Sequence, residues 1–208
     1  MTYFPDRLFD DAGSYATAYF EQYRTAAASV DQEALRRAGE LVGQVISEGA
    51  AIYSCGNGGS AAIANHLACD CLKGIRTGTL LRPKVFSLST TVELITAIAN
   101  DISYDDVFAF QLESLAKPGD LLVAISSSGQ SPNIVKALTW AKDNGLRTLA
   151  MTGFSGGASA EIADVSLHVA GENYGVVEDI HQSLMHLLAQ YTRHRSLTNP
   201  SDLGRQKF

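Results

Sequence analysis

Apolar residues recur at helical intervals through the first quarter of the chain. Between Ser14 and about Ser47, tyrosines, leucines and valines return every three or four positions among charged side chains, as in amphipathic helices. The stretch is long for one helix, and residues 29–31 offer a break at which Asp31 can cap a second helix. We therefore expect an N-terminal helical extension over residues 1–48, whose apolar stripe packs on its own sheet or on another subunit.

Beyond Gly49 the pattern changes to short apolar runs that end in turns of small residues. The run at residues 50–55 (AAIYSC) leads into GNGGS at 56–60, and a helical stretch follows. The same order returns at residues 120–125 and in SSSGQS at 126–131, before a helix that starts at Pro132 and ends near Gly145. Further apolar runs predict three more strands and a last helix, at residues 84–88, 147–152, 165–169 and 177–195.

Alternation of strands and helices predicts an α/β fold with a parallel sheet that is covered on both faces. In such folds ligands gather beyond the carboxyl ends of the strands. Both small-residue loops, at 56–60 and 126–131, follow predicted strands directly, so we expect them at that end of the sheet.

Length, composition and charge narrow the class of protein. A chain of 208 residues, of which 46% are hydrophobic and 18% charged, fits one globular domain. The net charge of −6 speaks against a nucleic-acid partner, and no run is long and apolar enough for a membrane span. With no visible signal peptide, we expect a cytoplasmic protein. The three clustered cysteines are then reduced thiols rather than a disulfide framework: Cys55, Cys69 and Cys71.

Both loops carry the residue types that bind a phosphate at the start of a helix. Free N–H groups and the helix dipole favour an anion there, and glycine lets the backbone come close to it. Neither loop contains Lys or Arg, and neither has the spacing of a nucleotide-binding motif. The simpler alternative is a tight strand–helix turn. We expect neutral donors to hold a phosphate monoester, namely Asn57, Gly58, Gly59, Ser60, Ser126, Ser127, Ser128 and Ser131.

Two further sets of polar residues have helical spacing. His66 and Asp70 lie four positions apart and share a helix face. Glu178, Gln182 and His186 lie at i, i+4 and i+8, within a stripe about 80° wide. The two faces supply the acid and base groups that proton transfer needs, if they meet over one substrate.

The motifs carry a resemblance to a known family. ISSSGQSPN at residues 125–133 resembles the signature of the SIS (sugar isomerase) domain, and GNGGSAA at 56–62 with His66 resembles the bacterial phosphoheptose isomerase group. That group also contains SIS proteins that bind the replication initiator and have no known isomerase activity. The resemblance spans about residues 15–195. It implies a single SIS domain over residues 1–208, a three-layer αβα sandwich with a five-stranded parallel, flavodoxin-like sheet.

The resemblance also implies roles for individual residues. Asp70 stands where the phosphoheptose isomerases have a glutamate base, one methylene longer, and His186 matches their second catalytic residue. Glu178 stands where they have a substrate-binding glutamine, and Asp101 matches a residue near the substrate hydroxyls. Some members bind zinc, and the matching ligands are His66, Asp70, Glu178 and His186. Plain alternatives remain: a solvent-facing acid for Asp70, an ion pair for Glu178 and a turn residue for Asp101.

The implied reaction is aldose–ketose isomerisation of a phosphosugar by enediol proton transfer, from sedoheptulose 7-phosphate to D-glycero-D-manno-heptose 7-phosphate. The alternative is a non-catalytic phosphosugar-binding protein that acts as a scaffold or regulator of a protein partner, as in the initiator-associating members. The shortened carboxylate of Asp70 favours that alternative, whereas the retained His186 speaks against it. Members of the family are homotetramers, so the resemblance implies a homotetramer here.

Overall fold

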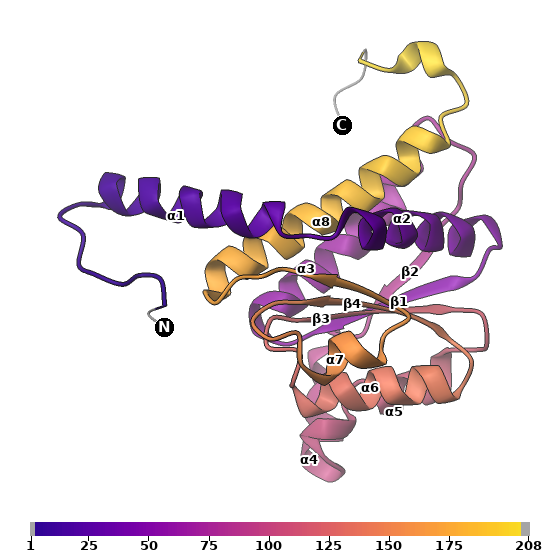
Figure 1. Ribbon diagram of the computed structural model, residues 1–208. Helices are drawn as coiled ribbons and strands as arrows, with labels where there is room; N and C mark the ends of the chain where they lie inside the picture. The colour runs from indigo at the N-terminus through magenta and orange to yellow at the C-terminus, as the bar shows by residue number, and fades with distance from the viewer. Residues whose placement is uncertain (1–2, 205–208) are drawn as a thin grey trace.

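The computed structural model describes residues 3–204, and its centre is one parallel β-sheet. The strands lie in the order β2-β1-β3-β4-β5, and each pair of neighbours is parallel. Helices cover both faces, which confirms the predicted three-layer sandwich with a five-stranded parallel sheet (Figure 1). The strands are β1 (Ala51–Gly56), β2 (Lys84–Ser87), β3 (Leu121–Ser126), β4 (Arg147–Thr152) and β5 (Val165–His168).

Burial of the central strands explains why they are short apolar runs. Every residue of β1 and β3 is buried, as expected for strands that are covered on both faces. Successive side chains point to opposite faces, so Ile52 packs in one layer and Tyr53 in the other.

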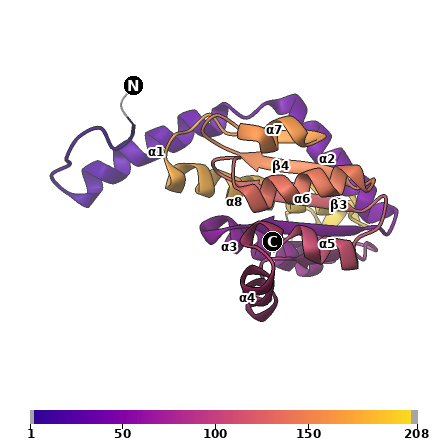
Figure 2. The same ribbon diagram turned by 90° about the horizontal axis from the view of Figure 1, so that it is seen from below.

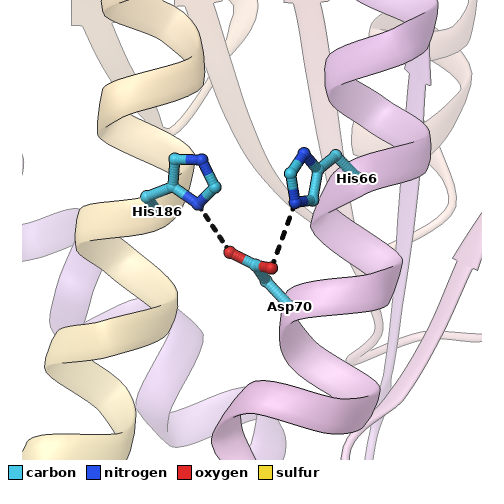
Figure 3. Close-up of side chains that lie close together, drawn as sticks. All are labelled: His66, Asp70 and His186. Carbon is cyan, nitrogen blue, oxygen red and sulfur yellow. Dashed lines mark hydrogen bonds and ion pairs between the residues drawn. The ribbon is translucent and has the colours of Figure 1, made fainter. Parts of the chain in front are cut away.

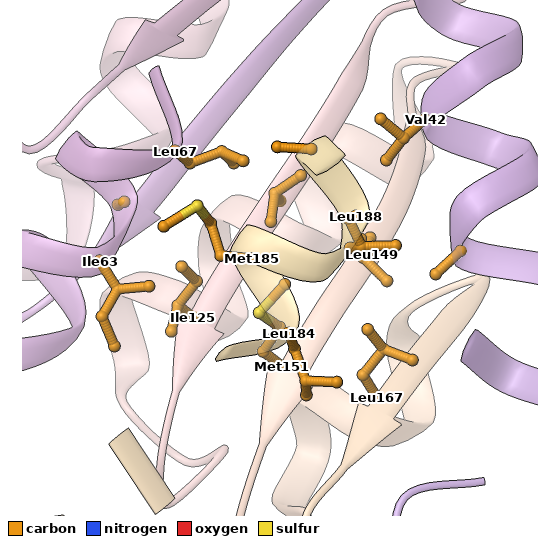
Figure 4. Packing of buried hydrophobic residues seen from close by; sticks show 14 of the residues in the cluster. Val42, Ile63, Leu67, Ile125, Leu149, Met151, Leu167, Leu184, Met185 and Leu188 are labelled. Carbon is orange, nitrogen blue, oxygen red and sulfur yellow. The ribbon is translucent and has the colours of Figure 1, made fainter. Parts of the chain in front are cut away.

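The first helical layer contains the long helices of the chain. Leucines, valines and methionines of this layer pack on the large aliphatic residues of the sheet, such as Ile125, Leu149 and Met151 (Figure 4). The helices are α1 (Ala12–Ala28), α2 (Gln32–Ser47), α3 (Gly58–Cys69) with its π-helical continuation η1 (Asp70–Ile75), and α8 (Tyr174–Arg195).

The second layer, on the opposite face, contains α6 and several shorter helices (Figure 2). Ile134, Ala137 and Leu138 of this layer share a second core cluster with residues of the sheet such as Tyr53 and Leu122. The helices are α4 (Val92–Asp101), η2 (Tyr104–Asp106), α5 (Ala109–Leu115), α6 (Pro132–Asp143) and α7 (Gly157–Ile162); a last turn, η3 (Pro200–Asp202), follows α8.

The predicted break in the N-terminal helical region is confirmed. The first helix ends at Ala28, and the carboxylate of Asp31 accepts hydrogen bonds from the backbone N–H groups of Glu33 and Ala34 at the start of α2. Part of α1 packs on its own domain, because Tyr19 donates a hydrogen bond to Asp179 of α8 at 2.6 Å. Burial and this bond raise the pKa of the Tyr19 hydroxyl.

Two features of the helices differ from the sequence-based expectation. Helix α8 begins at Tyr174 rather than at residue 177, because the side chain of Asn173 accepts a hydrogen bond from the N–H of Val176 and caps it. Helices α4, α5 and α7 were not predicted. Within residues 3–204, none of the helices is long and apolar enough to cross a membrane.

The strand order places both small-residue loops at one point of the sheet. The chain steps outward from β1 to β2 and then returns to β3 on the other side of β1. The loops after β1 and β3 therefore lie next to each other at a topological switch point, where open α/β sheets bind their ligands.

Candidate functional site

A pocket of about 130 Å³ opens where the loops after β1 and β3 meet the start of α8. Five serines supply most of its polar lining, and two residues of α8 close it from the side. The pocket lies at the N-termini of α3 and α6, where free backbone N–H groups favour an anion. Its lining residues are Asn57, Ser60, Ile125, Ser126, Ser127, Ser128, Ser131, Tyr174 and Glu178.

The serine hydroxyls of the second loop are available to a ligand in different degrees. Ser126 and Ser128 accept hydrogen bonds from nearby backbone N–H groups, each at 3.2 Å. The hydroxyl of Ser127 is buried and has no hydrogen-bond partner in the described part of the chain. A buried hydroxyl without a partner is costly, and a phosphate oxygen in the pocket would satisfy it.

Asn57 is held in the first loop by two polar neighbours. Its amide exchanges two hydrogen bonds with the amide of Asn133, both at 2.9 Å, and its Oδ1 also accepts the hydroxyl of Tyr104 at 3.0 Å. Both lone pairs of Oδ1 are then occupied, and one hydrogen on Nδ2 remains. Asn57 can therefore only donate to a ligand, which suits a phosphate oxygen.

Glu178 lies against the first loop. A Cβ placed on Gly59 would be 2.3 Å from Oε2 of Glu178, so only glycine allows the carboxylate to approach this closely. Burial, followed by the charge of Asp179, raises the pKa of Glu178. The carboxyl group thus lines the pocket and lies close to the N-terminus of α3.

A second group of side chains, the histidine–aspartate cluster, lies further along α3 and α8 and consists of His66, Asp70 and His186 (Figure 3). Nδ1 of His186 is 2.7 Å from Oδ2 of Asp70, and Nε2 of His66 is 3.3 Å from Oδ1. The exposed fractions of the three side chains are 45% for His66, 20% for Asp70 and 38% for His186, so solvent reaches the cluster. The two helix faces meet as their spacing indicated.

Gln182 completes the cluster from α8. Its Nε2 is 3.2 Å from Nδ1 of His66 and 2.9 Å from Nε2 of His186. The imidazole rings of the two histidines meet edge to face, with centroids 4.9 Å apart.

The backbone changes its helical form at Asp70. Helix α3 ends at Cys69, and the wider π-helical turn η1 starts at Asp70. Such turns are rare and occur often at functional sites. Cys71, the next residue, is buried, and burial raises the pKa of its thiol to about 12, so it stays protonated. Cys69 is exposed and Cys55 is buried, and all three cysteines are free.

Two residues do not lie where the resemblance led us to expect them. Asp101 ends α4, is exposed, and accepts a hydrogen bond from the side chain of Asn100; it does not line the pocket between the two loops. Glu178 lines the pocket but is not among the grouped metal-ligating atoms, which belong to His66, Asp70 and His186 and lie within 4.8 Å of one another. Gly58 is exposed at the start of α3.

Sequence reasoning missed three residues that the site uses. Asn133 and Tyr104 hold Asn57, and Tyr174 lines the pocket. Asn133 lies inside the SIS-like motif, which was a usable signal. Nothing in the local spacing indicates the two tyrosines.

The chemistry of the cluster fits a divalent metal ion. Two imidazoles and one carboxylate form a common three-ligand set for zinc at catalytic sites, with a further position left for water or substrate. The fit covers three of the four residues that the resemblance implied, because Glu178 stands with the pocket instead.

Comparisons with known proteins identify the family of this chain. The family model for the SIS domain matches residues 16–153, and the chain belongs to the SIS domain family. A phosphoheptose isomerase from Nitratidesulfovibrio vulgaris is 42% identical over 151 residues, which are 72% of this chain and 71% of that protein. A probable phosphoheptose isomerase from Thermoplasma volcanium is 38% identical over 170 residues, 82% of this chain and 86% of that one.

A solved structure extends the similarity to three dimensions. Phosphoheptose isomerase GmhA from Neisseria gonorrhoeae superposes with a TM-score of 0.80 at 32% identity, over 88% of this chain and 98% of that chain. The expected resemblance is confirmed, and so is the prediction of an enzyme related to the phosphoheptose isomerases.

Proposed function

We propose that the protein isomerises sedoheptulose 7-phosphate to D-glycero-D-manno-heptose 7-phosphate. The observation that carries the proposal is the position of the pocket between the two loops, to which we assign the phosphate, and of the histidine–aspartate cluster along the same pair of helices. Gly59 and Glu178 touch near the starts of α3 and α8, and Asp70 and His186 touch further along, so the helices run side by side.

The spacing of the two groups suits a long, open sugar. His186 lies eight residues after Glu178 on α8, about 12 Å along the helix. An open-chain ketose with a phosphate at its far end can place the phosphate among the serines and its C1 and C2 near Asp70. A short triose phosphate would not span this separation.

We assign the proton transfers to the cluster. Asp70 would remove a proton from C1 of the ketose, and a proton from His186 would reach the carbonyl oxygen on C2, giving the enediol. Removal of the proton from the C1 hydroxyl and return of a proton to C2 would then give the aldose. Both groups are within hydrogen-bond distance of each other, so the proton can pass between them.

The other pocket residues would bind and orient the substrate. Asn57 and the N-termini of α3 and α6 would hold the phosphate oxygens, with Gly58, Gly59, Ser60 and the loop serines. Glu178 would contact sugar hydroxyls, and Asp101 remains a proposed substrate contact. A zinc ion held by His66, Asp70 and His186 would supply Lewis-acid polarisation of the sugar oxygens. The resemblance also implies Glu178 as a ligand, but its carboxylate lines the pocket and would reach the ion only by moving toward the cluster.

We also propose a homotetramer, as the resemblance implies. The groove between α2 and α8, lined by Leu35, Leu187 and Tyr191 among others, is an apolar surface that a second copy would cover. A molar mass in solution of about four times 22.2 kDa would support the proposal, and a monomeric mass would refute it.

Proton exchange in heavy water tests the proposed reaction. Incubation with sedoheptulose 7-phosphate should introduce deuterium at C1 or C2 and yield the aldose. If no ketose phosphate of five to seven carbons shows exchange, the protein is not such an isomerase. The alternative is then a phosphosugar-binding protein that acts as a scaffold or regulator.

A further inference from the structure

We propose that Tyr174 determines specificity by closing the end of the pocket between the two loops, so that the pocket takes a terminal phosphate and rejects a phosphate that carries a second substituent. Phe154 is the residue that positions the Tyr174 ring. The inference rests on the proposed function in one respect, the assignment of a phosphate to this pocket. Tyr174 lines the pocket, and its side chain is 60% exposed at the start of α8.

The place of Tyr174 on α8 puts it at the end of the pocket that faces away from the reacting carbons. Glu178 follows Tyr174 by about one helical turn, and both line the pocket. His186 lies about two turns further in the same direction. A phosphosugar with its phosphate in the pocket and its carbonyl end at the histidine–aspartate cluster therefore extends away from Tyr174.

A second substituent on the phosphate would meet the Tyr174 ring. In a monoester, nothing extends past the phosphate on the side opposite to the sugar. In a diphosphate or a phosphodiester, a further group leaves the phosphorus on that side. The two loops line the rest of the pocket, so the further group would need the space that Tyr174 occupies.

Phe154 supports the Tyr174 ring in an unusual conformation. The centroids of the two rings are 4.7 Å apart, and their planes are inclined at 54°. Phe154 has a φ of 49°, and in the described part of the chain it is the one residue other than glycine with a positive φ. This conformation is costly for a bulky residue, persists only where neighbouring contacts hold it, and is typical of ligand clamps and active sites.

Backbone hydrogen bonds fix the turn of Phe154 to the pocket. The N–H of Gly153 donates to the carbonyl of Ser127 in the second loop at 2.8 Å, and the N–H of Phe154 donates to the carbonyl of Gly171 at 2.9 Å. The Phe154 ring is therefore held relative to the serines that line the pocket. Exposed side chains ordinarily change rotamer within nanoseconds, so contact with a fixed ring is what keeps Tyr174 across the end of the pocket.

Removal of the Tyr174 ring should change which anion binds rather than how tightly phosphate binds. Pyrophosphate is a small probe, because it is a phosphate with one further phosphoryl group. Overpacking typically costs a factor of about 5 to 150 in an equilibrium constant. We expect the ratio of the Kd for pyrophosphate to the Kd for phosphate to fall on the order of tenfold in Tyr174→Ala, while the Kd for phosphate changes little.

The test is isothermal titration of the full chain with inorganic phosphate and with pyrophosphate, in the presence of EDTA. Tyr174→Phe keeps the ring. Phe154→Gly keeps the left-handed backbone, which glycine adopts freely, but removes the support of Tyr174. Phe20→Ala is the matched control, because Phe20 is 66% exposed, lies on α1 and does not line the pocket. The thermal unfolding midpoint verifies that each variant is folded.

We expect the wild-type ratio in Tyr174→Phe and Phe20→Ala, and a lower ratio in both Tyr174→Ala and Phe154→Gly. An unchanged ratio in a folded Tyr174→Ala variant would overturn the proposal, and so would a wild type that binds neither anion. If the ratio falls as expected but the wild type isomerises no ketose phosphate, the role of Tyr174 stands and the proposed function fails. If the wild type isomerises its substrate and the ratio does not change, only the inference about Tyr174 fails.

Discussion

At the scale of single residues, the most direct consequence concerns Asp70. It is the carboxylate that both histidines face, and we assign it the removal of the substrate proton. Asp70→Asn should lower kcat by about 10²- to 10⁴-fold, the usual contribution of a general base. A coupled assay for heptose 7-phosphate formation measures the loss. Asp143→Asn, at an exposed position that ends α6, should leave kcat unchanged, and a fully active Asp70→Asn variant would remove Asp70 from the mechanism.

Tyr104 should act on substrate binding through Asn57. Tyr104→Phe removes the hydroxyl that donates to Oδ1 of Asn57 at 3.0 Å, and one hydrogen bond contributes about 0.5–1.5 kcal/mol. The KM should rise about 3- to 10-fold while kcat changes little, as steady-state kinetics would show. Tyr15→Phe serves as the control, because Tyr15 lies on α1 and does not line the pocket. A fall in kcat at constant KM would contradict this role.

Sequence reasoning reached the site residues only where their partners are close in the chain or part of a motif. The pairing of His66 with Asp70 follows from a spacing of four, and the loop serines follow from their place after a strand. Asn57 and Asn133 are 76 residues apart, so their mutual hydrogen bonds exist only after the sheet has formed. Spacing placed Gln182 on the right face of the last helix, but its particular contact with His66 depends on how the two helices pack.

At the scale of helices and strands, the contact between α3 and α8 fixes the site. Gly59→Ala would place a Cβ 2.3 Å from Oε2 of Glu178 and force the carboxyl group away from α3. Overpacking of this kind costs about 1–3 kcal/mol, and we expect kcat/KM to fall on the order of tenfold.

A matched substitution separates this effect from helix stability. Gly43 lies within α2, and a Cβ there would meet nothing within 4 Å. Gly43→Ala should therefore raise the free energy of unfolding by about 0.5–1 kcal/mol without loss of activity. Equal kcat/KM for Gly59→Ala and the wild type would contradict the close contact with Glu178. Chemical denaturation supplies the stability of both variants.

The regular elements were predictable where the pattern is strong. The buried strands are apolar runs, and the observed bounds of β4 equal the predicted ones, residues 147–152. Helix α2 was placed because Asp31 has the chemistry of an N-cap. Helices α5 and α7 are seven and six residues long, too short for an apolar stripe to repeat. Their position depends on packing against the sheet, and a short stretch of sequence does not reveal such packing.

At the scale of the whole molecule, a buried histidine ties stability to pH. His181 of α8 is fully buried, and burial lowers its pKa to about 4. Between pH 6.5 and 4 the unfolded chain binds a proton that the folded chain excludes, so stability falls as the pH falls. The loss is about 3 kcal/mol for 2.5 pH units.

Denaturation with urea at several pH values measures this dependence. His181→Leu should show a smaller loss of stability between pH 6.5 and 4 than the wild type, because carboxyl groups contribute equally to both. Identical slopes would show that His181 binds its proton equally well in the folded and unfolded chain.

The proposed isomerase must bind the phosphate and transfer the proton on one and the same substrate. The decisive measurement is deuterium incorporation into sedoheptulose 7-phosphate in heavy water, followed by NMR for the wild type and for Asp70→Asn. We predict deuterium at C1 or C2 together with the aldose product for the wild type, and a loss of both in the variant. A wild type that binds the phosphosugar but incorporates no deuterium would contradict the proposed isomerase.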